Sequence, residues 1–273
     1  MHTRPWMPVR LSLLARSVSI LVLSTACLEA SELATPQPGY ETGLAAIQKI
    51  NNELYTALDA KKRGQIQKEP IVLEQVAAPC LAPALTADGS GQTVELSAGF
   101  ITLMNQFSHA KAIEEADKGF LKQFAAALSV QTGEKALTPL AVERTNVWDA
   151  DTMNSQAGNF NQMAGTLIAI DLAHHYLGHY KKYAAQLTAS NGQPVPINSL
   201  LTEKEWREAV LKGARNALDC GYGVDGIRCV YDTLASMPNR PPWAAQFIHP
   251  KANVAKINSD LMRLENDFFL VGK

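Results

Sequence analysis

The sequence predicts a mainly helical α+β fold, and three features support this. Apolar residues recur at spacings of three and four over most of the chain, which is the pattern of amphipathic helices. One short segment, Thr93–Leu96, alternates as a strand does. No internal repeat or low-complexity segment interrupts the pattern. One strand-forming region among many helices indicates a mainly α domain with a small sheet.

Composition limits the possible functions. The chain has 273 residues, of which 47% are hydrophobic and 19% charged, with a formal charge of −1. These values are ordinary for a soluble globular protein with one sizeable core. No basic cluster suggests binding to nucleic acid, and no block of like charges suggests a disordered tail.

The N-terminal segment has the organisation of a secretory signal. Three arginines lie within residues 1–16, the apolar run covers 17–23, and small residues occupy 24–26. This order predicts export to the periplasm or the medium, with cleavage after Ala26. The alternative is a membrane anchor, which needs about 20 apolar residues, and this run is far shorter. No transmembrane helix is expected beyond the signal.

The cysteines suit an oxidising destination. Cys27 directly follows the small residues, so a lipid anchor on it is an alternative to plain secretion, although Ser24 is a poor residue for lipoprotein processing. Cys220 and Cys229 flank a turn-rich stretch and are candidates for a disulfide. Two buried thiols are the alternative. Cys80 has no obvious partner.

The elements are expected in a definite order. A helix over 41–62 precedes a loop over 79–92, and the strand 93–96 continues beyond a bend through Gly99–Leu103. Thr202 is a good N-cap residue, with Glu203 and Glu205 in the following turn. The other helices are expected at 108–129, 137–147, 154–188, from 202 to 218, 225–236 and 251–268. The chain divides into a signal (1–26), an N-terminal helical segment and loop (27–92), and a main domain (93–273).

A pair of histidines carries the strongest chemical signal. His175 and His179 are four residues apart in the expected helix 154–188, so both imidazoles would project from one face and could bind one metal ion. The zinc-peptidase motif H-E-x-x-H uses this spacing, and its glutamate is the general base. Tyr176 stands at the glutamate position here. The alternative is a solvated or core histidine pair without metal.

Three segments resemble one peptidase family. Ala173–His179 is similar to the A-H-E-L-G-H helix of gluzincin metallopeptidases related to the CAAX prenyl endopeptidase and its soluble periplasmic relatives. Glu208–Ala214 is similar to the family's E-A-D-x-x-G-A segment, and Phe247–Pro250 to its T-H-P segment. Gly221 and Tyr222 lie where the family has a G-Y-D-P turn. All these segments occur in the family's order.

The resemblance implies a zincin-like metallopeptidase domain that acts on peptides or unfolded proteins. Transferred by position, His175, His179 and Glu208 are the zinc ligands, and the fourth position of the ion stays open for water or substrate. Glu203 and Glu205 are competing carboxylates. Helical phase allows Glu205, but not Glu203, to share a face with Glu208.

Departures from the family pattern affect its chemistry. Tyr176 is a proton donor at neutral pH rather than a base, and loss of a positioned base costs about 10²–10⁴-fold in rate. Val210 replaces the family's aspartate. Asp171 lies one turn before His175 and either orients that imidazole or has no role. His249 resembles a histidine that lies near the family's metal, and a structural turn histidine is the alternative.

Three functional hypotheses follow from these residues. The first is an exported pseudo-peptidase with weak or lost peptidase activity, a binding or scaffold module of the same fold that has a zinc site or has lost the metal. The second is an active zinc endopeptidase of the cell envelope. The third is a structural envelope protein without metal.

Overall fold

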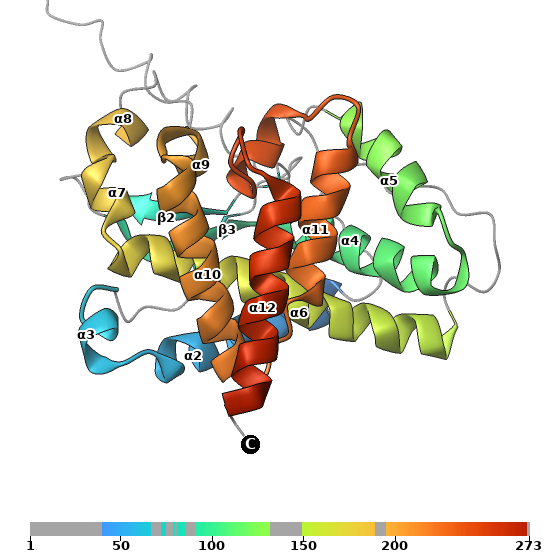
Figure 1. The fold of residues 1–273 in the computed structure, drawn as a ribbon, viewed down its shortest axis with the longest axis horizontal. Coiled ribbons are helices and arrows are strands. Elements are labelled where there is room, and N and C mark those ends of the chain that lie inside the picture. The colour runs from blue at the N-terminus through green and yellow to red at the C-terminus, as the bar shows by residue number, and fades with distance from the viewer. Residues whose placement is uncertain are drawn as a thin grey trace, which may run out of the picture.

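The computed structural model describes residues 40–66, 72–74, 79, 81–85, 91–131, 149–188 and 195–271. Within them the protein is mainly helical, as predicted, with one small sheet (Figure 1). The expected signal, Cys27, Cys80 and the expected helix 137–147 lie outside the described residues. No described helix is both long enough and apolar enough to cross a membrane.

The described strands follow one another near the N-terminus, and helices precede and follow them. Their bounds are α2 (Tyr40–Ala57), α3 (Ala60–Arg63), β1 (Val72–Glu74), β2 (Leu81–Leu85), β3 (Gly91–Ser97), α4 (Ala98–Ala116), α5 (Phe120–Ser129), α6 (Ala150–Tyr176), α7 (His179–Lys182), α8 (Ala184–Thr188), α9 (Ile197–Leu200), α10 (Glu203–Asp219), α11 (Asp225–Ser236), the 3-10 helix η1 (Pro242–Gln246) and α12 (Val254–Val271).

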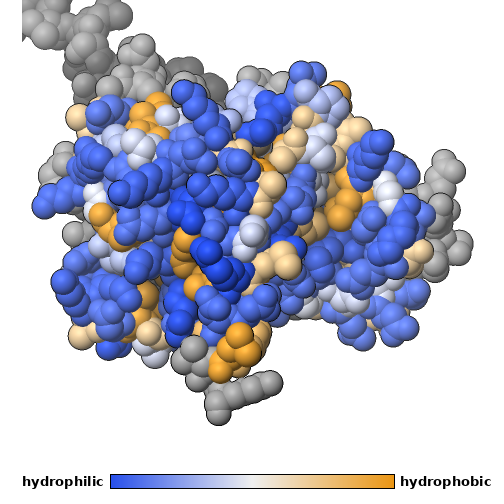
Figure 2. Space-filling view, in the orientation of Figure 1, coloured by the Kyte–Doolittle hydropathy of each residue, from blue (hydrophilic) through white to orange (hydrophobic). Residues whose placement is uncertain are grey.

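Helix α6 is the centre of the molecule. It packs against α2, α4, α10 and α11, and Figure 1 shows it passing behind α10 and α12. Its stretch from Met163 to His175 is buried without interruption. A helix that is buried on all sides shows no single apolar stripe, so its position in the core was not readable from periodicity alone. The outer face over α10 and α12 is mostly hydrophilic (Figure 2).

Glycines allow α6 to approach its neighbours at backbone distance. A Cβ atom added at Gly213 of α10 would lie 2.5 Å from the Cα atom of Ile170. A Cβ atom added at Gly226 of α11 would lie 2.8 Å from the backbone nitrogen of Met163. Real Cβ atoms do not come this close to backbone, so only glycine fits at these two crossings.

The sheet has the strand order β1-β3-β2, with β1 parallel and β2 antiparallel to β3. Its register pairs Val72 with Glu95 and Leu81 with Leu96. The strand predicted at 93–96 is therefore confirmed. The prediction of a loop throughout 79–92 is wrong, because β2 forms there. The sheet also joins segments on both sides of residue 92, where we expected a domain boundary.

Two other element predictions are corrected. Gly99–Leu103 does not continue the strand, because the Ser97 side chain accepts a hydrogen bond from the Phe100 amide and caps α4 at that point. The expected helix 41–62 is present but divides into α2 and α3, since Asp59 caps a new helix by accepting a bond from the Lys62 amide.

The C-terminal third agrees best with the sequence. Thr202 caps α10 in a full capping box with Glu205, as its position predicted. Helix α11 has the predicted bounds, and α12 begins three residues later than expected. Strong local signals, namely a good cap and clear amphipathic spacing, account for this agreement.

Candidate functional site

The two histidines of the zinc-peptidase-like motif lie on different helices. Helix α6 ends at Tyr176, Gly178 adopts a left-handed conformation with φ of 75°, and His179 begins α7. The amides of Leu177 and Gly178 bond back to the carbonyls of Ala173 and His175, which closes the helix end. The expected single helix 154–188 is therefore wrong, and with it the expectation that both imidazoles share a helical face.

His175 is directed toward a carboxylate of its own helix. Its Nε2 atom lies 3.5 Å from Oδ2 of Asp171, and both side chains are buried. The other carboxylate oxygen, Oδ1, accepts a hydrogen bond from the hydroxyl of Tyr180. The ring of Tyr180 also lies against that of His175, with centroids 4.5 Å apart. Asp171 thus bonds Tyr180, while its Oδ2 atom and Nε2 of His175 lie close together in the core without a hydrogen bond between them.

His179 is directed toward a residue that the motif does not include. Its Nδ1 atom lies 2.9 Å from Nδ1 of His174, and both rings are buried. Such a contact needs one ring to donate a proton and the other to accept it. Burial lowers the pKa of His174 to about 3, with a smaller opposing effect of Asp171. Burial also lowers the pKa of His179, so both rings are held neutral.

His174 is the site residue that sequence reasoning missed. On a continuous helix it would face away from position 176. The turn at Gly178 brings His179 back over His174 instead. Glycine two residues after the last helical residue was the available signal, because glycine is favoured at that position of a helix end.

Tyr176 lies at the position of the missing base and is partly buried. Nζ of Lys62 lies 5.5 Å from the centre of its ring, so α3 covers this side chain. Burial raises the pKa of the Tyr176 phenol, and the charge of Asp59 raises it further. The phenol is therefore protonated at neutral pH and cannot serve as a general base there.

Glu208 lies on α10, which faces the C-terminal end of α6, and its side chain is exposed. Glu205 and Glu208 both act on His179 electrostatically and oppose the lowering of its pKa. Glu205 is engaged by Nζ of Lys182 at 2.5 Å and by the hydroxyl of Tyr183 at 3.0 Å. The fully buried Val210 follows on the same helix.

The donors do not fit a zinc centre as they are placed. A tetrahedral site needs His175, His179 and Glu208 to converge, but the two imidazoles point to Asp171 and to His174. Among the residues that the structure describes, no three histidine, cysteine, aspartate or glutamate side chains form a group able to hold a metal ion. The zinc site remains a prediction, and no chemical step is derived through a metal.

His249 is a turn histidine in this structure. Its Nδ1 atom accepts a hydrogen bond from the amide of Lys251 at 3.1 Å, which leaves Nε2 to donate to the carbonyl of Leu201 at 3.1 Å. The ring packs near Trp206, with centroids 6.1 Å apart. Both ring nitrogens are thus occupied in joining the loop after η1 to the start of α10.

Cys220 and Cys229 are free thiols, so the predicted bridge is not formed. The two side chains have different neighbours. Burial raises the pKa of Cys220, and the negative charge of Glu53 on α2 raises it further. Burial raises the pKa of Cys229 to about 11, and the charge that most opposes it is Lys111 of α4. The charges that act on the two thiols thus come from different helices.

Comparisons with protein-family models, with curated proteins and with solved structures gave no match. The site is therefore interpreted from its own geometry.

Proposed function

We propose that this chain is an exported, non-catalytic protein with a zinc-peptidase-like order of segments, which acts as a binding or scaffold module. In this proposal the residues that resemble a metal centre stabilise the fold. The basic leader, apolar run and small residues at 1–26 support export, and the three segments that resemble gluzincin peptidases support the relationship.

One observation carries the proposal. The helix that should present both histidines ends between them, and their imidazoles face different neighbours: Nδ1 of His179 contacts His174, whereas Nε2 of His175 lies toward Asp171 without a hydrogen bond to it. His179 must break its contact with His174 before its Nδ1 atom can bind a metal ion. A buried polar group without its partner costs about 1–3 kcal/mol, so the pairing of these two rings is favoured over its loss.

The position of the missing base supports the same conclusion. Tyr176 cannot accept a proton from water at neutral pH, and Lys62 of α3 lies over its ring. A peptidase needs this position to be open to both substrate and water. The competing hypotheses are an active zinc endopeptidase of the envelope and a structural envelope protein.

Hydrolysis of casein tests the proposal. The wild type, His179→Ala, Tyr176→Glu and Tyr176→Glu with His179→Ala are compared after incubation with zinc, with circular dichroism to confirm folding. We expect no cleavage by any of them, because a carboxylate at 176 does not turn His179 toward His175. Zinc-dependent cleavage by the wild type that is lost in His179→Ala would show that the chain is an active peptidase.

A further inference from the structure

A cavity of about 400 Å³ lies between the end of α11 and the turn after η1. Its volume is within the range of about 300–1,000 Å³ that is usual for small-molecule sites. The lining is apolar except for one side chain. It consists of Met237, Pro238, Arg240, Pro241, Pro242, Ala245, Ile248 and Pro250.

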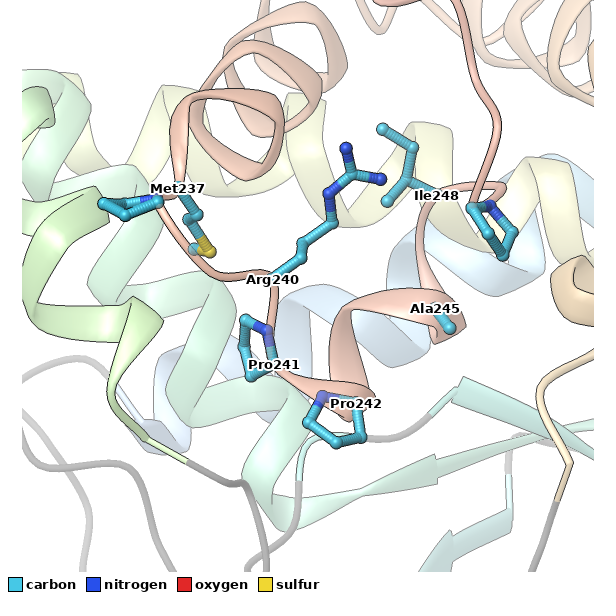
Figure 3. A pocket seen from close by; sticks show the side chains of 8 residues that line it. Met237, Arg240, Pro241, Pro242, Ala245 and Ile248 are labelled. Carbon is cyan, nitrogen blue, oxygen red and sulfur yellow. The ribbon is translucent and has the colours of Figure 1, made fainter.

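Arg240 is the charged residue of this lining. Figure 3 shows its side chain running from the loop toward Ile248. Within the part of the chain that the structure describes, no ion pair or hydrogen bond engages its guanidinium. A guanidinium presents a planar pair of donors that matches a carboxylate. The cavity therefore combines an apolar wall with one unpaired cation.

The walls of the cavity are formed in advance. Proline fixes its own φ, and four of the lining residues are prolines. The η1 segment is anchored from behind by Trp243, whose Nε1 donates to the carbonyl of Gln131 at 3.0 Å. The carbonyl of Gln246 accepts from Nδ2 of Asn198 at 2.9 Å. A rigid site loses little conformational freedom on binding, which favours affinity for small ligands.

We propose that this cavity binds a small carboxylate with an apolar body, the carboxylate at Arg240 and the body against the proline and Ile248 surface. Two kinds of ligand combine a carboxylate with an apolar body: a free aliphatic acid and the C-terminus of an apolar peptide. The cavity includes none of Asp171, His174, His175 and His179. Of the segments that resemble peptidases, it shares only Ile248 and Pro250. Failure of this proposal would leave the proposed function untouched.

Calorimetric titration of the purified protein tests the site with two matched pairs of probes. Octanoate is compared with octan-1-ol, and N-acetyl-leucyl-leucine with its C-terminal amide. Arg240→Gln removes the charge, while Arg263→Gln removes a comparably exposed arginine of α12 outside the lining and is the control. Ala245→Phe fills the cavity. Thermal unfolding of each variant shows that it is folded.

At least one carboxylate should bind about tenfold or more tightly than its neutral partner. Arg240→Gln should remove that advantage, Arg263→Gln should retain it, and Ala245→Phe should weaken carboxylate and neutral probe alike. Binding of octanoate alone identifies a free acid as the ligand type, and binding of the peptide alone identifies a C-terminus. Failure of both carboxylates to bind at millimolar concentration, or equal binding by Arg240→Gln and wild type, overturns the proposal.

Discussion

The two halves of the central helix are held in different ways. The middle of α6 meets α10 and α11 at backbone distance, through Gly213 and Gly226. The C-terminal end is held by polar contacts among buried side chains, Asp171 with Tyr180, and His174 with His179 of the following helix. Close packing determines the structure of the first region, whereas hydrogen bonds and the protonation state of the histidines determine the structure of the second.

This contrast shows what each region tolerates. Close contact between two backbones is lost when a single methyl group is added, but it does not depend on pH. A buried polar cluster tolerates changes of shape more easily, but it is destabilised when a hydrogen-bond partner is removed or a histidine ring gains a proton. The resemblance to a zinc peptidase falls entirely on the second region, which is why the site and the core must be tested separately.

The largest effect is expected at the crossing of α6 and α10. In Gly213→Ala the new methyl group meets the backbone of Ile170 and Ala169, so the helices must separate, and we expect a loss of about 3 kcal/mol in the free energy of unfolding. Gly158→Ala is the control, because nothing lies within 4 Å of its Cβ position, and it should stabilise by about 0.5–1 kcal/mol. Urea unfolding measures both. Equal stability of the two variants would show that the crossing is looser than described.

The polar end should respond to removal of one hydroxyl. Tyr180→Phe leaves the buried Asp171 without its donor, and we expect a loss of about 2 kcal/mol in the free energy of unfolding. Tyr183→Phe removes a hydroxyl that bonds Glu205 nearer the surface, and it should cost less than about 1 kcal/mol. A Tyr180→Phe protein as stable as the wild type would mean that the cluster contributes nothing to the fold.

A lower pH should destabilise the contacts at the C-terminal end of α6 but not the close packing of its middle. His174 has a folded pKa of about 3, below its ordinary value, so the unfolded chain binds the proton first and stability falls as the pH drops below about 6.5. The loss from His174 between pH 6.5 and 5.5 is about 1 kcal/mol. His174→Gln should flatten this slope, while Gly213→Ala should keep it. A slope unchanged by His174→Gln would assign the pH dependence to other groups.

The smallest effect is expected at Glu208. Its side chain is exposed, so Glu208→Ala should change the free energy of unfolding by no more than about 0.5 kcal/mol. Glu205→Ala is the matched comparison on the same helix. It removes half of a capping box and the contacts to Lys182 and Tyr183, and should cost about 1 kcal/mol. A larger loss at Glu208 than at Glu205, seen only with zinc present, would indicate a metal ligand.

Sequence reasoning succeeded where the deciding signal was local. Thr202 with Glu205 marked the start of α10, and the amphipathic spacing from Asp225 to Ser236 marked α11. The alternation at Thr93–Leu96 marked β3, although its partners are separate short strands that only tertiary pairing reveals.

The candidate site needed information that is not local. The spacing of His175 and His179 predicts a shared face only if the helix continues, and Gly178 ends it. Periodicity alone could not show this, because glycine is also tolerated within helices. The pairing of His179 with His174 depends on the path of the chain after that turn. Such contacts between side chains of different elements are set by packing rather than by spacing.

The measurement that bears most directly on the account is the zinc content of the folded protein after equilibrium dialysis against zinc. We expect far less than one zinc per chain in the wild type, with the same value in His175→Ala and in Glu208→Ala, because the donors do not converge. One zinc per chain in the wild type, lost in both variants, would contradict it and establish the metal centre that the motif resembles.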